Sequence, residues 1–426
     1  MKKIYILICL LILSTIILKT NFVGFLALDN GHYQYDSEDL AIGAIVAEKY
    51  NINNSWVGLG RITSNNIGKE FIAEDIYLNK LDINNNLNFG KYSSQIGLQG
   101  DFYAIISKFV ESKYLIEFFR WLNSFLLSVI LLAICYIIQI KYNFLMAIIW
   151  GIVFLFSPYI LNFSHNLYWV EFTWFLPILI GLIAATDFIN FKFKNLFVAI
   201  GIFASIFLKC LCGYEYLSTI MIAMVMFVLS DIIVNIFERN MLEIKRKSKL
   251  FFIISLCSLC GFTAALSVHG YYRGNGNILT GIHDIYQKDV LRRTIVGNEN
   301  NFTSSNKLIM KSISVPTTKV IVKYFKPYSA KQNFIIKLIG KSFWPLSVVA
   351  LIIMLFRLYY RKFNQMDNIQ IMSLFLISLM STLSWIILAK SHSYIHTHMN
   401  YVLWFLGYVQ MMIYILVSSL LALKKG

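Results

Sequence analysis

Residues 216–236 read YLSTIMIAMVMFVLSDIIVNI, and this stretch decides the fold class. It holds one charged residue, Asp231, in a run long enough for a transmembrane helix, which needs about 20 mostly apolar residues. A similar apolar run begins at residue 4, and others occupy residues 115–138, 144–161, 169–186, 195–211, 250–268, 342–358, 370–389 and 401–422. We therefore expect an all-α polytopic membrane protein with about ten transmembrane helices in a single domain, residues 1–426.

The composition excludes other classes of protein. Of the 426 residues, 58% are hydrophobic and 14% are charged, and the mean hydropathy is +0.63. A soluble domain has roughly 45–50% apolar and about 25% charged residues, so a soluble protein is excluded. The formal net charge of +16 would suggest nucleic acid in a soluble chain. Because membrane proteins gather Lys and Arg in their cytoplasmic loops, we expect no nucleic-acid partner here.

The charge distribution predicts the orientation in the membrane. Met1-Lys2-Lys3 precedes apolar residues 4–18 and 22–28 without a small-residue cleavage site, which indicates an uncleaved first span. With a cytoplasmic N-terminus, every inner connection is short and basic, as the positive-inside rule requires. We expect both termini in the cytoplasm of a bacterium, the chain in its inner membrane, and all seven histidines on the outer side.

Two long loops then face outward, residues 29–113 and 270–340. The first contains two candidate amphipathic helices, residues 37–50 and 101–113, which could lie flat in the headgroup layer. The second holds 11 basic and three acidic residues between Arg273 and Lys337. This excess favours an anion such as a lipid phosphate or a pyrophosphate, although plain solvation or headgroup contact is an equal alternative.

The first candidate for chemistry is the acidic segment Tyr35-Asp36-Ser37-Glu38-Asp39, directly after the first span. A carboxylate of Asp36, Glu38 or Asp39 could take a proton from an acceptor hydroxyl at the membrane surface. The simpler interpretation is helix capping, with Asp36 or Ser37 as the N-cap and the other acids in the first turn. The two interpretations are compatible.

The second candidate is the segment 390–400 between the last two spans. It contains Lys390, His392, Tyr394, His396 and His398. Contact with a phosphate suits these side chains better than a metal, because no carboxylate is near in sequence. The alternative is an interfacial cap at headgroup level.

Other ionisable residues are also candidates for substrate binding. Lys209 and Glu215 lie at the ends of two spans, where they could pair with each other or carry function. The further candidates are Arg61, Glu171 within an aromatic belt, Tyr216, Arg273, Arg292 and Arg293. The six cysteines all lie in apolar stretches, so we expect them to pack as small apolar residues without a disulfide framework.

Together these features resemble the C-type (GT-C) membrane glycosyltransferases. That family has about ten or more spans and an acidic motif after the first span, followed by two membrane-lying helices. Here Asp36, Glu38 and Asp39 match the motif by position, and residues 37–50 and 101–113 match the helices. The acidic pattern is Asp-x-Glu-Asp rather than a plain Asp-Asp, so the identity of the base stays open.

The resemblance implies transfer of a sugar, with inversion, from a polyprenyl-phosphate carrier to a glycan, lipid or protein acceptor on the outer face. One carboxylate would be the general base, and cations would stabilise the leaving phosphate. Members of the family differ in their use of a divalent metal such as Mg or Mn, so the cofactor stays open. The alternatives are a polysaccharide polymerase or ligase, a flippase or transporter for a lipid-linked sugar, and a membrane scaffold. A transporter would need charges at mid-span and repeats.

Overall fold

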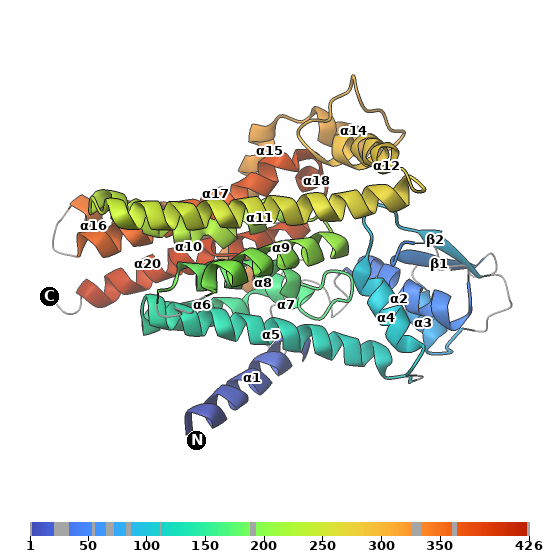
Figure 1. Ribbon diagram of the computed structural model, residues 1–426, viewed down its shortest axis with the longest axis horizontal. Coiled ribbons are helices and arrows are strands. Elements are labelled where there is room, and N and C mark those ends of the chain that lie inside the picture. Colours follow the sequence, from blue (N-terminus) through green and yellow to red (C-terminus); the bar gives the residue numbers. More distant parts are fainter. Residues whose placement is uncertain are drawn as a thin grey trace.

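The computed structural model describes residues 2–20, 34–52, 56–64, 72–81, 87–110, 112–187, 193–325, 334–359 and 364–423, without the side chains of 2–4 and 334–342. Long helices run side by side along the long axis of the molecule, and short elements gather at one end (Figure 1). At this end, which we call the loop end, α5 (Leu115–Lys141) begins and α11 (Met241–Arg273) ends. The apolar run 22–28 and His32 lie outside the described residues.

A helix lies at every position where the sequence predicts a span. Besides α5 and α11 these are α1 (Lys2–Thr20), α6 (Phe144–Phe156), α8 (Phe172–Ala185), α9 (Lys194–Cys212), α10 (Leu217–Phe237), α16 (Phe334–Tyr359), α17 (Gln365–Leu388) and α20 (Tyr408–Leu423). Within the described chain, five of them (α5, α9, α10, α11 and α17) are long and apolar enough to cross a membrane, and a bent pair ending in α20 would be a sixth. The protein is therefore an all-α membrane protein, and the count of ten spans stays a prediction.

Asparagine side chains mark the starts of several helices. Asn143 accepts a hydrogen bond from the amide of Met146 at 2.8 Å at the start of α6. Asn364 accepts one from Met366 at 3.1 Å at the start of α17. The first amides of a helix have no partner inside the helix, so each such cap contributes about 1 kcal/mol. The starts of these helices are therefore encoded locally.

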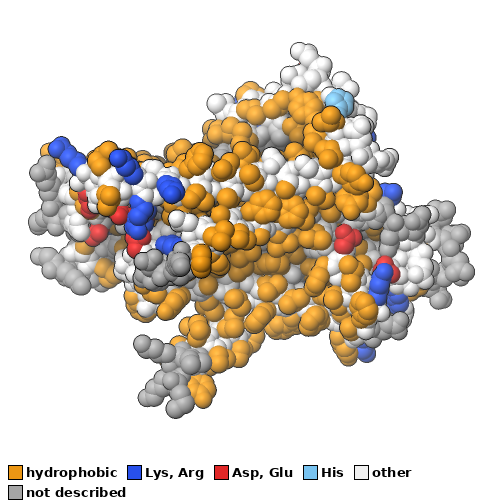
Figure 2. Space-filling view, viewed as in Figure 1, with side chains coloured by type: hydrophobic (Ala, Val, Ile, Leu, Met, Phe, Trp, Pro, Cys, Tyr) orange, Lys and Arg blue, Asp and Glu red, His pale blue; other side chains and the backbone are white. Residues whose placement is uncertain are grey.

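The helices of the bundle pack around α10, which contacts α8, α11 and α17. A reciprocal pair of hydrogen bonds joins α10 to α17. The hydroxyl of Thr219 donates to the carbonyl of Ser381 at 2.9 Å, and the hydroxyl of Ser381 donates to the carbonyl of Thr219 at 2.8 Å. Apolar side chains form a broad belt on the outside of the bundle, and charged side chains gather toward its two ends (Figure 2). This distribution is the one that a lipid environment requires.

The end of the bundle opposite the loop end is held by a buried ion cluster around Asp231 of α10. Its carboxylate lies 2.9 Å from the ammonium of Lys141 and 3.1 Å from that of Lys247. Both lysines also donate to the carbonyl of Ala185, at the C-terminus of α8, at 3.1 Å. Cations at a helix C-terminus offset its dipole. The one charge in the stretch 216–236 is thus the centre of a clamp that joins α5, α8, α10 and α11.

The last predicted span, residues 401–422, is broken near its start. Thr397–Phe405 and Tyr408–Ala422 meet at an angle of 50°. Gly407 at the break has φ 139°, a conformation that glycine adopts without strain. The Gln410 side chain accepts from the amide of Gly407 at 3.1 Å and donates to the carbonyl of Phe405 at 2.5 Å. These bonds satisfy backbone groups that the break leaves open.

The first long loop forms a small folded unit at the loop end. Its elements are α2 (Tyr35–Lys49), β1 (Gly60–Ser64), α3 (Ala73–Tyr77), β2 (Leu87–Lys91) and α4 (Leu98–Ser107). The two strands pair antiparallel, with Gly60 opposite Lys91 and Ser64 opposite Leu87. This hairpin was not expected from the sequence, because its strands are short and contain glycine. α4 begins and ends earlier than the predicted helix 101–113.

The prediction that residues 37–50 lie flat on the membrane is wrong. Residues 38–47 of α2 are all buried, because β1, α3 and α4 pack around the helix. Gly43 allows this approach, since a Cβ atom at that position would lie 2.0 Å from the carbonyl oxygen of Gly60. The predicted cap is also wrong, because the N-cap residue is Gln34, and its side chain makes no capping hydrogen bond.

The second long loop is largely helical. It contains α12 (Ile278–Ile285), a π-helical turn over Tyr286–Val290, α13 (Leu291–Arg293), α14 (Lys307–Ser314) and α15 (Thr317–Tyr324). Three of these helices, α13, α14 and α15, pack on α18 (Lys390–Ile395), which follows α17. The ammonium of Lys390 donates to the carbonyl of Ile313 at 2.6 Å and fixes α18 against α14. The predicted 270–340 loop therefore joins the segment 390–400 in one structure.

Candidate functional site

A cavity of about 460 Å³ opens at the loop end, where the first loop meets the second loop and segment 390–400. It brings together parts of the chain as distant as α2 and α18. The residues that line it are Gln34, Asp36, Ser37, Tyr92, Tyr168, Trp169, Glu215, Arg292, Arg293, Asn306, Leu308, Ile309, His392, Ile395, His396, His398 and Met399. Seven of the predicted site residues are among them: Asp36, Glu215, Arg292, Arg293, His392, His396 and His398.

Two arginines of α13 form the cationic wall of the cavity, and Asp289 holds them. Its carboxylate lies 3.4 Å from the guanidinium of Arg292 and 3.6 Å from that of Arg293. Arg273, at the end of α11, binds the other carboxylate oxygen at 2.6 Å. The nearby arginines, Arg293 first, hold the pKa of Asp289 below its usual value against the effect of burial. Arg273 also pairs with Asp284 at 2.7 Å, so three arginines share two carboxylates here, and the wall keeps an excess of positive charge.

The arginine wall is also joined to the first loop. The hydroxyl of Ser94 donates to Asp289 at 2.9 Å, and Arg273 donates to the carbonyl of Ser93 at 2.9 Å. The guanidinium of Arg293 donates to the hydroxyl of Tyr92 at 3.4 Å. The π-helical turn over Tyr286–Val290 lies just before the two arginines, and such turns occur frequently at functional sites.

Three histidines form the adjoining wall. The ring centroids of His392 and His396 lie 4.6 Å apart, and those of His396 and His398 lie 6.2 Å apart. Burial, helped by His398 and the two arginines, lowers the pKa of His396 to about 4. The same effects, burial first, hold the pKa of His392 well below its usual value. These two rings are therefore neutral at pH 7, and Nδ1 of His392 is buried without a hydrogen-bond partner among the described residues.

Carboxylates and aromatic rings complete the cavity. Asp36 is exposed in the first turn of α2 and acts electrostatically on His398. Glu215 is buried and accepts a hydrogen bond from the hydroxyl of Tyr168 at 3.3 Å. The ring centroids of Tyr168 and Trp169 lie 4.9 Å apart. An anion could bind between the arginines and histidines, and Asp36 could accept a proton beside it.

The other two acids of the predicted motif have structural partners. Glu38 is buried and bridges to Arg120 of α5 at 2.8 Å, and it also accepts from the amide of Leu167 at 3.1 Å. Asp39 is fully buried and accepts from the amide of Ala73, the first residue of α3, at 2.9 Å. Asp39 therefore caps a helix, but this helix is α3 and not its own.

Burial raises the pKa of Asp39 to about 6. Its second carboxylate oxygen has no hydrogen-bond partner among the described residues. Neither Glu38 nor Asp39 lines the cavity, so of the three proposed bases only Asp36 reaches it.

The remaining predicted site residues do not line the cavity. The ammonium of Lys209 is buried and donates to the carbonyl of Gly213 at 2.6 Å. Glu171 is buried, and neither carboxylate oxygen has a partner among the described residues. The other five also lie outside the cavity lining. Arg61 lies in β1, Tyr216 stacks on Trp169, and Arg273 pairs with Asp289. Lys390 donates a hydrogen bond to α14, and Tyr394 lies beneath the ammonium of Lys323.

Several residues of the site were missed by the sequence analysis. Tyr92, Tyr168 and Asn306 carried no pattern that distinguished them from other polar or aromatic residues. Asp289, which holds the arginine wall, offered a usable signal. It precedes Arg292 by three and Arg293 by four residues, which is the spacing of neighbours on a helix.

The cationic and histidine side chains suit an anion better than a metal ion. In the described part of the chain, no group of three or more His, Cys, Asp or Glu side chains is arranged to hold a metal ion. All six cysteines are free thiols. The positive charge of Arg292 and Arg293 beside the histidines would also repel a metal cation.

Comparisons with known proteins identify no relative of this chain. No family model, no curated protein and no solved structure matches this chain.

Proposed function

We propose that the protein is a membrane glycosyltransferase that moves a sugar from a polyprenyl-phosphate carrier to an acceptor hydroxyl. The observation that carries the proposal is the cavity at the loop end, in which the Asp36 carboxylate shares one space with Arg292, Arg293 and three histidines. A sugar-phosphate substrate needs both kinds of group. One must take a proton from the acceptor, and the other must stabilise the negative charge on the leaving phosphate.

In the proposed reaction, Asp36 accepts the proton of the acceptor hydroxyl. The oxygen of that hydroxyl forms a bond to the anomeric carbon from one side, while the bond from this carbon to the phosphate oxygen breaks on the other side. The electron pair leaves with the phosphate, whose charge Arg292 and Arg293 stabilise. Attack opposite the leaving group inverts the configuration at the anomeric carbon. Tyr92, Tyr168 and Trp169 offer aromatic faces for the sugar ring.

The histidines suit the phosphate because of their protonation. Burial and neighbouring positive charges lower the pKa of His392 and of His396, so both rings are neutral. A neutral imidazole can donate one hydrogen bond, and an anion among these groups would offset the repulsion between the nearby cations. The proposal takes the loop end as the outer side of a bacterial inner membrane, with ten spans and both termini inside, as the positive-inside rule predicts.

The test is sugar transfer by the purified protein in proteoliposomes, measured with radiolabelled polyprenyl-phosphate sugars and a mixture of cell-envelope acceptors. Asp36→Asn should lower the rate about 100-fold or more, since general-base catalysis contributes roughly 10²–10⁴-fold. Asp75→Asn is the matched control, because Asp75 is an acid of the same loop that pairs with Lys80 and lies outside the cavity. Unchanged transfer by Asp36→Asn contradicts its role as the base. Absence of transfer by the wild type with every lipid-linked donor contradicts the function.

A polysaccharide polymerase or ligase is the second candidate. The observation that favours it is the source of the cationic groups, which come from the second loop and from segment 390–400 and not from the first loop. The two candidates differ in their donor. A glycosyltransferase of the proposed kind transfers single sugars, whereas a polymerase or ligase transfers a preassembled lipid-linked oligosaccharide. The mass added to the acceptor in the same assay separates them.

A further inference from the structure

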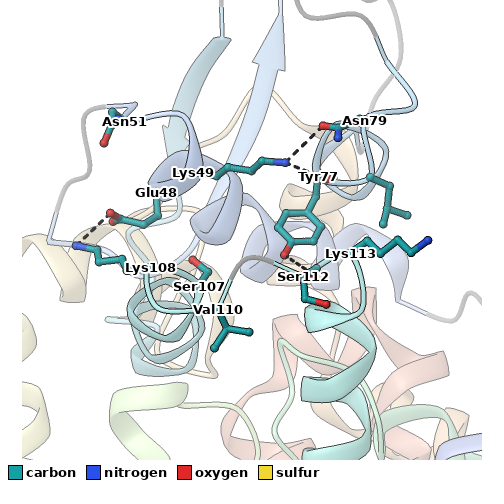
Figure 3. A pocket seen from close by; sticks show the side chains of 11 residues that line it. Glu48, Lys49, Asn51, Tyr77, Asn79, Ser107, Lys108, Val110, Ser112 and Lys113 are labelled. Carbon is teal, nitrogen blue, oxygen red and sulfur yellow. Dashed lines mark hydrogen bonds and ion pairs between the residues drawn. The ribbon is translucent and has the colours of Figure 1, made fainter.

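A second cavity, of about 500 Å³, lies in the first loop and shares no residue with the candidate site. It forms where α2, α3 and α4 end, just before α5 begins, and we call it the lysine groove after Lys49, Lys108 and Lys113 (Figure 3). The candidate site lies at the first turn of α2 and the groove at its last turn. The two are therefore about 20 Å apart along a helix that rises about 1.5 Å per residue.

The lysine groove carries an excess of positive charge. Among the described residues, three lysines and one acid, Glu48, line it. Lys49 donates to the carbonyl of Tyr77 at 3.3 Å and to the side-chain oxygen of Asn79 at 3.4 Å, and Lys108 pairs with Glu48 at 3.1 Å. Lys108 and Lys113 are both exposed at the rim. Since Glu48 can neutralise only one of the cations, the groove favours an anionic ligand.

The groove also offers polar groups for a ligand that carries hydroxyls. Asn51 and Asn79 both line it, and both have left-handed backbone conformations, with φ 52° and 55°. Asparagine tolerates this conformation better than most residues do. The hydroxyl of Tyr77 donates to the carbonyl of Ser112 and closes one wall at 2.8 Å (Figure 3). Amide side chains can donate to and accept from the hydroxyls of a phosphate-linked glycerol.

Exposed apolar residues adjoin the groove, and one of them, Val110, lines it. Phe102, Ile105 and Val110 are exposed on and after α4, and Phe109 has 81% of its surface exposed. Tyr114 is exposed directly before α5 enters the bundle. Exposed aromatic and apolar residues next to lysines, at the end of a membrane helix, are typical of the headgroup layer. A soluble anion would leave this surface uncovered, whereas the acyl chains of a lipid would cover it.

We infer that the lysine groove binds the headgroup of an anionic phospholipid, with the phosphate at Lys108 and Lys113 and the acyl chains beside Phe109. The bound lipid anchors α4, which also supports the candidate site. Gln99 of α4 donates to the carbonyl of Tyr168 at 2.7 Å and to that of Cys212 at 3.1 Å. Tyr168 lines the site cavity, so α4 connects the lipid contact to the site.

The test measures lipid retention and does not depend on enzyme activity. The protein is reconstituted in phosphatidylcholine nanodiscs with or without phosphatidylglycerol, then released, and the lipid that stays bound is determined by native mass spectrometry. Lys108→Gln combined with Lys113→Gln should reduce the affinity for phosphatidylglycerol about 30-fold, because each lysine near a membrane surface contributes a factor of about five. Lys80→Gln combined with Lys91→Gln removes the same charge from the same loop outside the groove and should retain the lipid.

Equal retention by the wild type and the Lys108/Lys113 double variant would overturn the inference. So would binding of inorganic phosphate or glycerol phosphate at the groove without retention of phosphatidylglycerol, because the site would then take a soluble anion. If the double variant does not fold, the single variant Lys113→Gln, at an exposed position, is tested instead. Its affinity for phosphatidylglycerol should fall about fivefold. An unchanged affinity of that single variant contradicts the lysine groove as the site.

Discussion

At the scale of single residues, neighbours in the sequence have very different environments. Asp36, Glu38 and Asp39 lie within about one turn of α2, yet Asp36 lines the cavity, Glu38 pairs with Arg120, and Asp39 caps α3. Their local sequence is nearly the same, so local propensity could not distinguish them. The distinction comes from which neighbouring element each side chain meets, and that depends on residues far along the chain.

The raised pKa of Asp39 leads to a prediction about stability and pH. The carboxyl has a folded-state pKa of about 6, above its unfolded value near 4, so the folded state binds the proton more tightly. The wild type should therefore lose stability as the pH rises from about 4 to about 6. Asp39→Asn keeps an oxygen that can accept from Ala73, and it should be at least as stable as the wild type at about pH 7 without this loss.

The measurement for Asp39 is the midpoint of thermal unfolding between about pH 4 and pH 7, followed by tryptophan fluorescence in detergent. Asp39→Ala is the matched control, because it also removes the charge but loses the cap of α3, at a cost of about 1 kcal/mol. A wild-type midpoint that rises over this pH range more than that of Asp39→Asn would falsify the assignment. Full sugar transfer by Asp39→Asn is expected as well, because Asp39 does not line the cavity.

At the scale of elements, glycines decide how closely the first loop can pack. Gly100 in α4 lies against the backbone of Gly58, and a Cβ atom at Gly100 would be 1.5 Å from the carbonyl oxygen of Gly58. This contact is with backbone, which cannot rotate away as a side chain can. The close approach brings α4 to α2 and to the bundle, and it thereby sets the position of Gln99 beside the candidate site.

Gly100→Ala is therefore expected to destabilise the first loop by about 2 kcal/mol or more, as overpacking of a core does. Gly90→Ala is the matched control, since a Cβ atom there would be at an ordinary 3.6 Å from the carbonyl oxygen of Arg61. Hydrogen exchange of the first-loop amides measures the effect. Protection of α2 and α4 should fall in Gly100→Ala and not in Gly90→Ala, and equal protection in the wild type and both variants would show that the close contact relaxes without cost.

At the scale of the whole molecule, the two ends of the bundle differ in the kind of polar group they hold. One end has the cluster of Asp231, Lys141 and Lys247, and the loop end has the candidate site. The positive-inside rule predicts that the loop end is outside the cell. In a variant without its native cysteines, Lys288→Cys at the loop end should react with a membrane-impermeant thiol reagent in intact cells.

Arg239→Cys provides the matched position, because Arg239 is exposed between α10 and α11 at the other end of the bundle. It should react only after the cells are permeabilised. Both cysteines should be labelled equally in permeabilised cells, which controls for their accessibility in the fold. Labelling of Arg239→Cys and protection of Lys288→Cys in intact cells would reverse the predicted orientation.

The sequence by itself determined the membrane class and the position of the apolar helices along the chain. These follow from a local property, namely apolar runs of sufficient length. It also identified most of the ionisable groups that meet at the loop end. Apolar runs and clusters of charged residues can be recognised in the sequence, because each depends on residues close together in the chain.

Only the tertiary structure decided which of those groups share a cavity and which are structural. The burial of α2, the hairpin of β1 and β2, and the pairing of Glu38 with Arg120 all depend on contacts between distant segments. A buried charge needs a partner, and the local sequence does not indicate which distant residue the fold brings close to it. For that reason the three acids at the start of one helix separated into one cavity residue, one ion pair and one helix cap.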